Sequence, residues 1–219
     1  MMIGIFHMDS ILYLDVETNG RGSFRPAKQR IVQLAYLIGD VEVSRFIKDV
    51  QYVNPEVPHP YDVNFLQSHG DDFNEVIDEF GRHLKNCTHI VAHNIKFDLG
   101  CIVNEFIERS GGKSNQIYGD EKFGPLLEEM NKKTLYDTML STVNICKIKS
   151  SKHSTSYKWP RLEELYDHLF KKKPDYILHD ALNDCKVTRE CLEELMSTNQ
   201  VILPNLTIPR QVRFGESCQ

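Results

Sequence analysis

The sequence lacks several features that would assign it to a large class of proteins. No uninterrupted apolar run reaches the roughly 18 residues that a membrane span needs, and the first residues lack the basic and apolar stretches of a secretory signal. Internal repeats, low-complexity tracts and Gly/Ser linkers are also missing. We therefore expect a soluble intracellular protein, cytoplasmic or nuclear and not bound to a membrane. It would form one domain over residues 1–219, with a core at about 10–200 and a C-terminal tail at 201–219.

Paired cysteines and an excess of positive charge are absent as well. The six cysteines are scattered without a CxxC pair, which favours reduced thiols over disulfides or a zinc site. The 26 Lys and Arg residues are outnumbered by 31 Asp and Glu residues. This balance disfavours a protein that coats long nucleic acids, because such binding needs many cationic contacts to phosphate. An enzyme that holds only a strand end remains compatible with it, since bound cations would reverse the field at an acidic site.

What is present is an alternation of strand and helix patterns. Apolar runs predict strands at 11–16, 31–38 and 41–53, and Gly39-Asp40 suits a two-residue hairpin turn between the last two. The other expected elements are strands at 89–92 and near Leu135, helices at 73–84, 99–107, 137–146, 161–170 and 181–197, and loops at 110–133 and 147–160. This order predicts an α/β fold with a mixed central sheet flanked by helices: three early strands, two of them an antiparallel hairpin, plus parallel additions.

Carboxylates stand at the ends of these elements. Asp15 and Glu17 end the first predicted strand, and residues two apart on a strand point to the same face. Asp98 follows the strand at 89–92 and precedes the most regular helical pattern in the chain. Each position also has a structural interpretation: an exposed turn explains the first pair, and a helix N-cap explains Asp98.

A third acidic position opens the last predicted helix. His179 and Asp184 would lie about 140° apart if both were helical, so they converge only if His179 lies on the preceding loop and Asp184 in the first turn. Asp180 is a suitable N-cap for that start, and a capped helix with an exposed histidine is the structural alternative.

The four carboxylates together favour a metal site. Gathered in one cleft, Asp15, Glu17, Asp98 and Asp184 would repel one another unless cations lay between them. Oxygen-rich clusters suit Mg²⁺ or Mn²⁺ rather than zinc. Two such ions about 3.5–4 Å apart are used in phosphodiester hydrolysis. An imidazole that titrates near neutrality suits the removal of a proton from the attacking water.

The motifs have a family resemblance. Asp15-x-Glu17-Thr18, His93-Asn94-x-x-Phe97-Asp98 and His179-x-Ala181-x-x-Asp184 resemble, in order, the three motifs of the DEDDh (DnaQ-like) 3′→5′ exonuclease superfamily. Its members include proofreading subunits of replicative polymerases and three-prime repair exonucleases. The resemblance implies a ribonuclease-H-like fold and two divalent cations, Mg²⁺ or Mn²⁺. It also implies release of nucleoside 5′-monophosphates from the 3′ end of DNA or RNA.

The resemblance also implies a role for each matching residue. The metal ligands would be Asp15, Glu17, Asp98 and Asp184. Asp15 would bridge the two ions, and Asp98 would act on the second ion through water. His179 would be the general base. The residues that meet the terminal nucleotide would be Val16, Thr18, Asn94 and Phe97, the last of them packing behind the pocket.

Partners and rival functions follow from the same residues. The expected partner is a single-stranded or frayed 3′ end of DNA or RNA, with a polymerase or a replication or repair assembly as a further partner. A non-catalytic module that binds a strand end or a polymerase, and a nucleotide phosphohydrolase, are the alternatives. The basic segment from Lys147 to Trp159 fits an arm on the phosphate backbone. The alternative is a solvated loop in which Trp159 anchors the next helix beside Pro160, and for Trp159 we favour this second interpretation.

Overall fold

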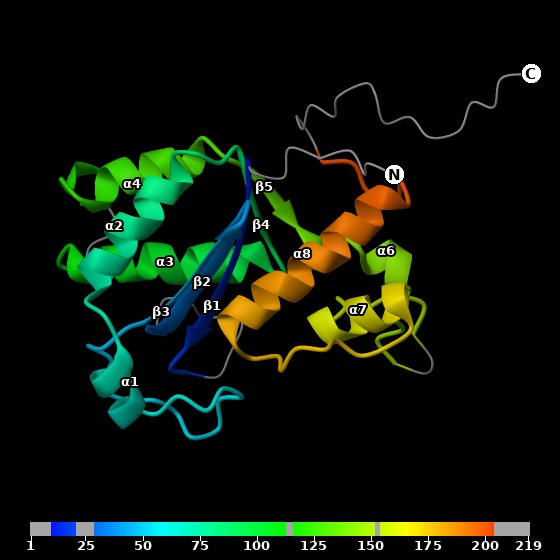
Figure 1. The fold of residues 1–219 in the computed structure, drawn as a ribbon, viewed down its shortest axis with the longest axis horizontal. Coiled ribbons are helices and arrows are strands. Elements are labelled where there is room, and N and C mark those ends of the chain that lie inside the picture. The colour runs from blue at the N-terminus through cyan, green and yellow to red at the C-terminus, as the bar shows by residue number, and fades with distance from the viewer. Residues whose placement is uncertain (1–9, 21–28, 113–115, 152–153, 204–219) are drawn as a thin grey trace, which may run out of the picture.

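A mixed five-stranded sheet organises the computed structural model, which describes residues 10–20, 29–112, 116–151 and 154–203 (Figure 1). The strands are β1 (Ile11–Thr18), β2 (Ile31–Ile38), β3 (Val41–Phe46), β4 (His89–Ala92) and β5 (Thr134–Asp137). The order across the sheet is β3-β2-β1-β4-β5. The first three strands are antiparallel neighbours, whereas β4 and β5 add in parallel to β1. The predicted mixed sheet is thereby confirmed.

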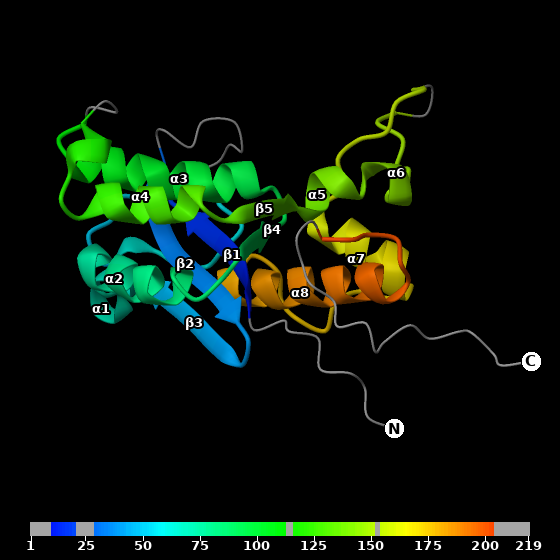
Figure 2. The ribbon, with the colours of Figure 1, turned by 90° about the horizontal axis from the view of Figure 1, so that it is seen from above.

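Helices cover both faces of this sheet. They are α1 (Val63–His69), α2 (Phe73–Leu84), α3 (Ile95–Arg109), the short 3₁₀ helix η3 (Ile117–Gly119), α4 (Phe123–Asn131), α5 (Thr138–Ser141), α6 (Val143–Cys146), α7 (Leu162–Phe170) and α8 (Ala181–Ser197). In both ribbon views α2, α3 and α4 lie on one side of the sheet, and α8, with α7 outside it, lies on the other (Figures 1 and 2). None of the described helices is long and apolar enough to cross a membrane.

The strand β1 separates two layers of the core because its side chains alternate between the faces. Leu12, Leu14 and Val16 belong to the cluster that α2 and α3 complete. Ile11 and Tyr13 pack instead with the apolar residues of α8. Positions 15 and 17 share the parity of Ile11 and Tyr13. The two carboxylates at the end of β1 therefore face α8.

Several predicted boundaries were wrong for local reasons. The third strand ends at Phe46 rather than at 53. The buried Ile47 and Val50 belong to the core but lie in the irregular segment that follows the strand. The predicted helix 137–146 is two short helices separated at Thr142. The segment expected as a loop at 110–133 contains η3 and α4, and α1 was not predicted. α1 buries only Leu66, which leaves little periodicity to detect. α4 does bury an apolar stripe at helical spacing, Phe123, Leu127 and Met130, which the sequence analysis missed.

Candidate active site

Asp98 reaches the end of β1 from the first turn of α3. Its side chain is only 2% exposed, and its Oδ1 accepts a hydrogen bond from the backbone N–H of Val16 at 3.2 Å. The N-cap of this helix is Asn94, in the left-handed region at φ 83°, so the helix begins abruptly after β4. Asp98 Oδ2 is buried and accepts no hydrogen bond from the described residues. One oxygen of a buried carboxylate is thus left without a donor.

Asp184 reaches the same place from the first turn of α8. The exposed His179 precedes this helix at φ 67°, and its backbone N–H donates to Asp184 Oδ2 at 3.3 Å. Glu17, His179 and Asp184 each offer a ligand atom, and these atoms lie within 4.8 Å of one another. Asp184 Oδ1 is buried and has no hydrogen-bond partner among the described residues. The expected position of His179 on the loop before the helix is confirmed.

The four carboxyl groups are held in an environment that disfavours their charge. Burial, followed by the neighbouring Asp98, Asp184 and Glu17, raises the pKa of Asp15 well above its usual value. Burial and the nearby Asp184 raise the pKa of Glu17 to about 8, and burial raises the pKa of Asp184 to about 7. Burial is also the main cause of the raised pKa of Asp98. No described Lys or Arg forms an ion pair with any of the four.

This donor set fits divalent cations such as Mg²⁺ or Mn²⁺. It consists of carboxylate oxygens, the ligands that these ions prefer, and two of the oxygens are buried without a donor. Asp98 is buried and the other three carboxylates are half-buried, and such an uncompensated cluster is costly unless cations neutralise it. The residues that would hold the ions are Asp15, Glu17, Asp98 and Asp184.

A second layer of hydrogen bonds fixes the start of α8. The N-cap is Asp180, as predicted, and its Oδ1 accepts from the backbone N–H of Asn183 at 3.0 Å. Its Oδ2 accepts from the hydroxyl of Tyr61 at 2.6 Å and from Gln33 Nε2 at 3.0 Å. Gln33 Oε1 accepts in turn from the backbone N–H of Ala181 at 3.0 Å. The loop that carries the histidine is therefore attached to β2 and to the segment before α1.

Tyr61 is itself held by ring stacking. Its ring stacks on His59 at 5.3 Å and on Phe65 at 5.1 Å, and Phe65 stacks on the exposed His69 at 4.5 Å. His59 Nε2 donates to the backbone oxygen of Thr18 at 2.9 Å. This column of rings connects the end of β1 with α1. Sequence reasoning missed Gln33, His59 and Tyr61, and the one available signal was a glutamine inside an otherwise apolar strand.

Asp137 is a further carboxylate that sequence reasoning did not assign to the site. It ends β5, and its Oδ1 accepts from the backbone N–H groups of Asn94 at 3.3 Å and Leu140 at 3.0 Å. Its buried Oδ2 has no partner among the described residues, and its charge contributes to the raised pKa of Asp98. The detectable signal was its place at the carboxyl end of a strand parallel to β4.

The predicted substrate contacts are close to the carboxylates but partly engaged already. The Thr18 hydroxyl is buried and donates to Gln29 Oε1 at 2.7 Å, and the Val16 N–H donates to Asp98. Phe97, in the first turn of α3, is partly buried and packs against the core. His93, in the same motif, donates from Nε2 to the Pro160 oxygen at 2.9 Å, and burial lowers its pKa. His93 is thus held as a structural residue.

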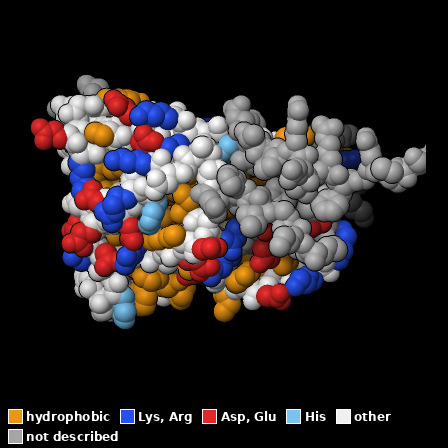
Figure 3. Space-filling model, turned by 45° about the horizontal axis from the view of Figure 1, so that its top comes forward, with side chains coloured by type: hydrophobic (Ala, Val, Ile, Leu, Met, Phe, Trp, Pro, Cys, Tyr) orange, Lys and Arg blue, Asp and Glu red, His pale blue; other side chains and the backbone are white. Residues whose placement is uncertain are grey.

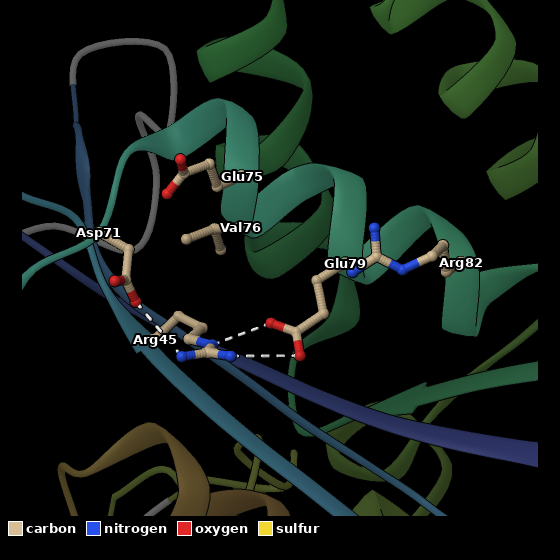
Figure 4. Close-up of a pocket in the computed structure, with 6 residues that line it drawn as sticks. All are labelled: Arg45, Asp71, Glu75, Val76, Glu79 and Arg82. Atoms are coloured by element: carbon tan, nitrogen blue, oxygen red, sulfur yellow. Dashed lines mark hydrogen bonds and ion pairs between the residues drawn. The ribbon is translucent and has the colours of Figure 1, made fainter.

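A surface pocket between β3 and α2 differs from this site in its charge balance (Figure 4). It is lined by Arg45, Asp71, Glu75, Val76, Glu79 and Arg82. The Arg45 guanidinium lies between its partners, with Nε 2.8 Å from Glu79 Oε2 and Nη1 3.5 Å from Asp71 Oδ2. The carboxylates of Asp71 and Glu79 are therefore matched by a cation of the chain itself.

Comparison with solved structures identifies proteins of the same fold. Exonuclease I from Methylocaldum szegediense superposes with a TM-score of 0.58 at 18% identity, over 87% of this chain and 41% of that chain. E. coli exonuclease I in complex with a dA16 oligonucleotide gives 0.54 at 16% identity, over 85% and 40%. Cell-death related nuclease 4 gives 0.55 at 13% identity, over 88% and 65%. The predicted ribonuclease-H-like fold is thereby confirmed.

The likeness extends to the fold alone. This chain spans about two-fifths of the length of the exonuclease I chains that it matches. No family model matches the chain, and neither does any curated protein sequence.

Proposed function

We propose that this chain is a divalent-metal-dependent 3′→5′ exonuclease that releases nucleoside 5′-monophosphates from DNA or RNA. The observation that carries the proposal is the cluster of four carboxylates with raised pKa values and two buried oxygens without donors. The cluster lies beside an exposed histidine, in a fold shared with proteins described as exonucleases. The 3′→5′ polarity follows from the resemblance of the three motifs.

The residues would divide the work of hydrolysis. Asp15, Glu17, Asp98 and Asp184 would hold two cations, which when bound supply positive charge to the scissile phosphate and favour ionisation of the attacking water. His179 would accept the proton of that water as its oxygen bonds to the terminal phosphorus. The bond from phosphorus to O3′ of the preceding nucleotide breaks and O3′ takes up a proton from solvent, which leaves a new 3′-hydroxyl end and a nucleoside 5′-monophosphate.

The surface supports a substrate held by its end. On the face drawn in Figure 3, the described Lys and Arg side chains are interspersed with Asp and Glu side chains. Long duplexes are held by extended clusters of cations, whereas a cleft with bound cations needs only the terminal phosphates. The acidic balance of the chain is consistent with the second arrangement.

The test uses 5′-labelled single-stranded DNA and RNA of matched sequence, with Mg²⁺, Mn²⁺ or EDTA. We expect a ladder that shortens from the 3′ end, is absent with EDTA and with Asp15→Ala, and is retained by the control variant Glu128→Ala, whose side chain is exposed on α4. An intact label under every condition, with folded protein, would indicate the non-catalytic binding module instead. Release of inorganic phosphate from nucleotides without a ladder would indicate the phosphohydrolase.

A further inference from the structure

The basic segment between α6 and α7 forms a short hairpin. Lys149 lies opposite Tyr157 in an antiparallel bridge. The Lys158 N–H donates to the Ile148 oxygen at 2.8 Å, and the Ser150 N–H donates to the Ser156 oxygen at 3.3 Å. In Figure 2 this segment extends outward from the body beyond α5 and α6. The two sides of this ladder have different surroundings.

One side of the ladder is exposed and combines cationic and aromatic groups. Cross-strand partners point the same way, as do residues two apart on an extended strand, so Lys149, Tyr157 and Trp159 share a side. Tyr157 is 39% exposed and Trp159 54% exposed, and Lys149 is exposed without an ion pair among the described residues. We call Lys149, Tyr157 and Trp159 the hairpin face.

The opposite side of the ladder is turned toward α7. Ile148 and Lys158 are half-buried, and Lys158 Nζ lies 2.6 Å from Glu164 Oε1. Pro160, at the end of the segment, is buried, whereas Trp159 is 54% exposed. This exposure disfavours the interpretation of Trp159 as the anchor of α7 and leaves much of its indole open to solvent.

The base of the hairpin is connected to the candidate active site. The Pro160 oxygen accepts the hydrogen bond from His93 Nε2, and His93 Nδ1 lies 3.0 Å from the Thr138 hydroxyl. His93 immediately precedes Asn94, the N-cap of the helix that carries Asp98. Trp159 of the hairpin face therefore immediately precedes Pro160, which is hydrogen-bonded to the segment that carries Asn94.

We propose that the hairpin face binds the single strand upstream of the scissile bond, an inference that rests on the proposed function. Exposed aromatic rings stack on unpaired bases of any sequence, and lysines beside them contact the intervening phosphates. Paired bases offer no free face to such rings. Lys147, which is exposed at the end of α6, adds a second cation at the base of the hairpin. The occupant is single-stranded DNA or RNA, because the rings and lysines recognise features that both share.

Tryptophan fluorescence reports directly on this contact, because Trp159 is the only tryptophan in the sequence. Tryptophan emission is followed while a 12-nucleotide single strand is added in EDTA, which prevents metal-dependent cleavage. We expect saturable quenching by the 12-mer and little by a dinucleotide, which is long enough to occupy only the candidate active site. A Lys149→Ser change should reduce the slope of log affinity against log salt by about 0.7, the value for one phosphate contact on a single strand.

Kinetics supply the second readout. In Mg²⁺, Trp159→Ala should lower kcat/KM on the 12-mer about tenfold more than on the dinucleotide, whereas Trp159→Tyr should restore most of the difference. The matched control is Tyr118→Ala, which removes an aromatic ring of similar exposure (62% against 54%) from η3 on the other side of the sheet. It should leave the ratio of the two substrates unchanged.

The outcomes separate the two proposals. Unchanged Trp159 emission at every concentration of the 12-mer, or equal quenching by a blunt duplex, overturns the role of the hairpin face, whether or not cleavage is seen. Saturable quenching without a cleavage ladder in Mg²⁺ overturns the exonuclease and leaves the hairpin face as a binding site.

Discussion

Two buried carboxylates on the same helix differ in the number of hydrogen-bond donors and cations around them. Asp98 and Glu105 lie about two turns apart on α3 and are 2% and 0% exposed. Glu105 Oε1 accepts from Arg30 Nε at 2.8 Å and from the Ile31 N–H at 3.0 Å. Its Oε2 accepts from Arg30 Nη2 and Arg109 Nε, each at 3.0 Å. Asp98 has one backbone donor, carboxylate neighbours and an oxygen without a partner.

The difference distinguishes structural from functional burial of charge. A buried carboxylate that serves the fold is stabilised by guanidinium groups and backbone donors, because an uncompensated charge inside a protein is costly. The Asp98 cluster has no such cationic partners, so its unfavourable free energy of burial remains. Bound cations would reduce that unfavourable free energy. Replacing Asp98 should therefore affect activity, whereas replacing Glu105 should affect stability.

The largest expected effect is the loss of activity in Asp98→Asn. Asparagine retains the oxygen that accepts from the Val16 N–H but removes one negative charge from the cluster. Cleavage should fall about a thousandfold, because metal binding supplies several kcal/mol to phosphodiester hydrolysis. The melting temperature in EDTA should stay constant or rise, since repulsion is reduced. A variant that melts many degrees lower in EDTA would show that Asp98 is a structural residue like Glu105.

The reciprocal change, Glu105→Gln, should destabilise the fold by about 3 kcal/mol. It leaves Arg30 and Arg109 without their main carboxylate partner, and the breaking of a buried ion pair has that magnitude. For a chain of this size, the melting temperature should fall by roughly 6–12 °C. Cleavage per folded molecule at low temperature should match the wild type. Activity lost in parallel with Asp98→Asn, at unchanged stability, would contradict the distinction.

The sequence predicted the parts of the site that depend on local geometry. The alternation along β1 placed Asp15 and Glu17 on one face, and the helical angle required His179 to lie before α8. Both features depend on neighbours within a few residues. The expectation of an Asp180 N-cap was likewise correct, because a cap is a local hydrogen bond.

The supporting residues could not be predicted in the same way. Gln33 and Asp180 are 147 positions apart, and Tyr61 and Asp180 are 119 apart, so their contacts exist only after the sheet and helices assemble. Around Glu105, Arg109 is a local partner four residues along α3, whereas Arg30 lies 75 positions away and reaches it only through tertiary packing. Trp159 and Pro160 are adjacent in the chain, and only the assembled fold determines which of the two is buried. Pro160 is buried and Trp159 is exposed.

A smaller effect should appear in the pH dependence of stability without metal. Glu17 has a pKa of about 8 in the folded chain against 4.5 ordinarily, and Asp184 about 7 against 3.8. The folded state therefore retains protons that the unfolded state has released, so the free energy of unfolding falls as pH rises through this range. Between pH 5 and 8 in EDTA, the wild type should lose on the order of 2 kcal/mol relative to Glu17→Gln.

Urea unfolding at several pH values measures this difference. His59 and His93, whose pKa values burial lowers, titrate in both proteins, and so their contribution cancels. Saturating Mg²⁺ should remove the loss in the wild type, because bound cations favour the ionised carboxylates. If the free energy of unfolding of the wild type instead rises with pH relative to that of Glu17→Gln, the charge of Glu17 is stabilised by groups of the chain itself.

The smallest expected effect concerns Asp180, whose two carboxylate oxygens both accept hydrogen bonds. It lies four residues before Asp184, whose Oδ1 has no partner among the described residues. Asp180 resembles Glu105, since its oxygens accept from Tyr61, Gln33 and the backbone, and these hydrogen bonds lower its pKa although burial opposes them. Tyr61→Phe removes one hydrogen-bond donor to a charged group, worth about 1.5–3 kcal/mol of stability. If Tyr61 is a positioning residue, kcat should fall about fivefold to tenfold with little change in KM.

Tyr36→Phe is the matched control for Tyr61→Phe. Its hydroxyl lies 2.7 Å from His83 Nδ1, between β2 and α2 and on the face of the sheet away from α8, so kcat should not change. Equal losses of kcat in the two variants would mean that the effect is one of general stability. A loss confined to Tyr61→Phe would mean that the chain uses compensated carboxylates to orient the loop that carries His179. The uncompensated carboxylates would then be reserved for the cations.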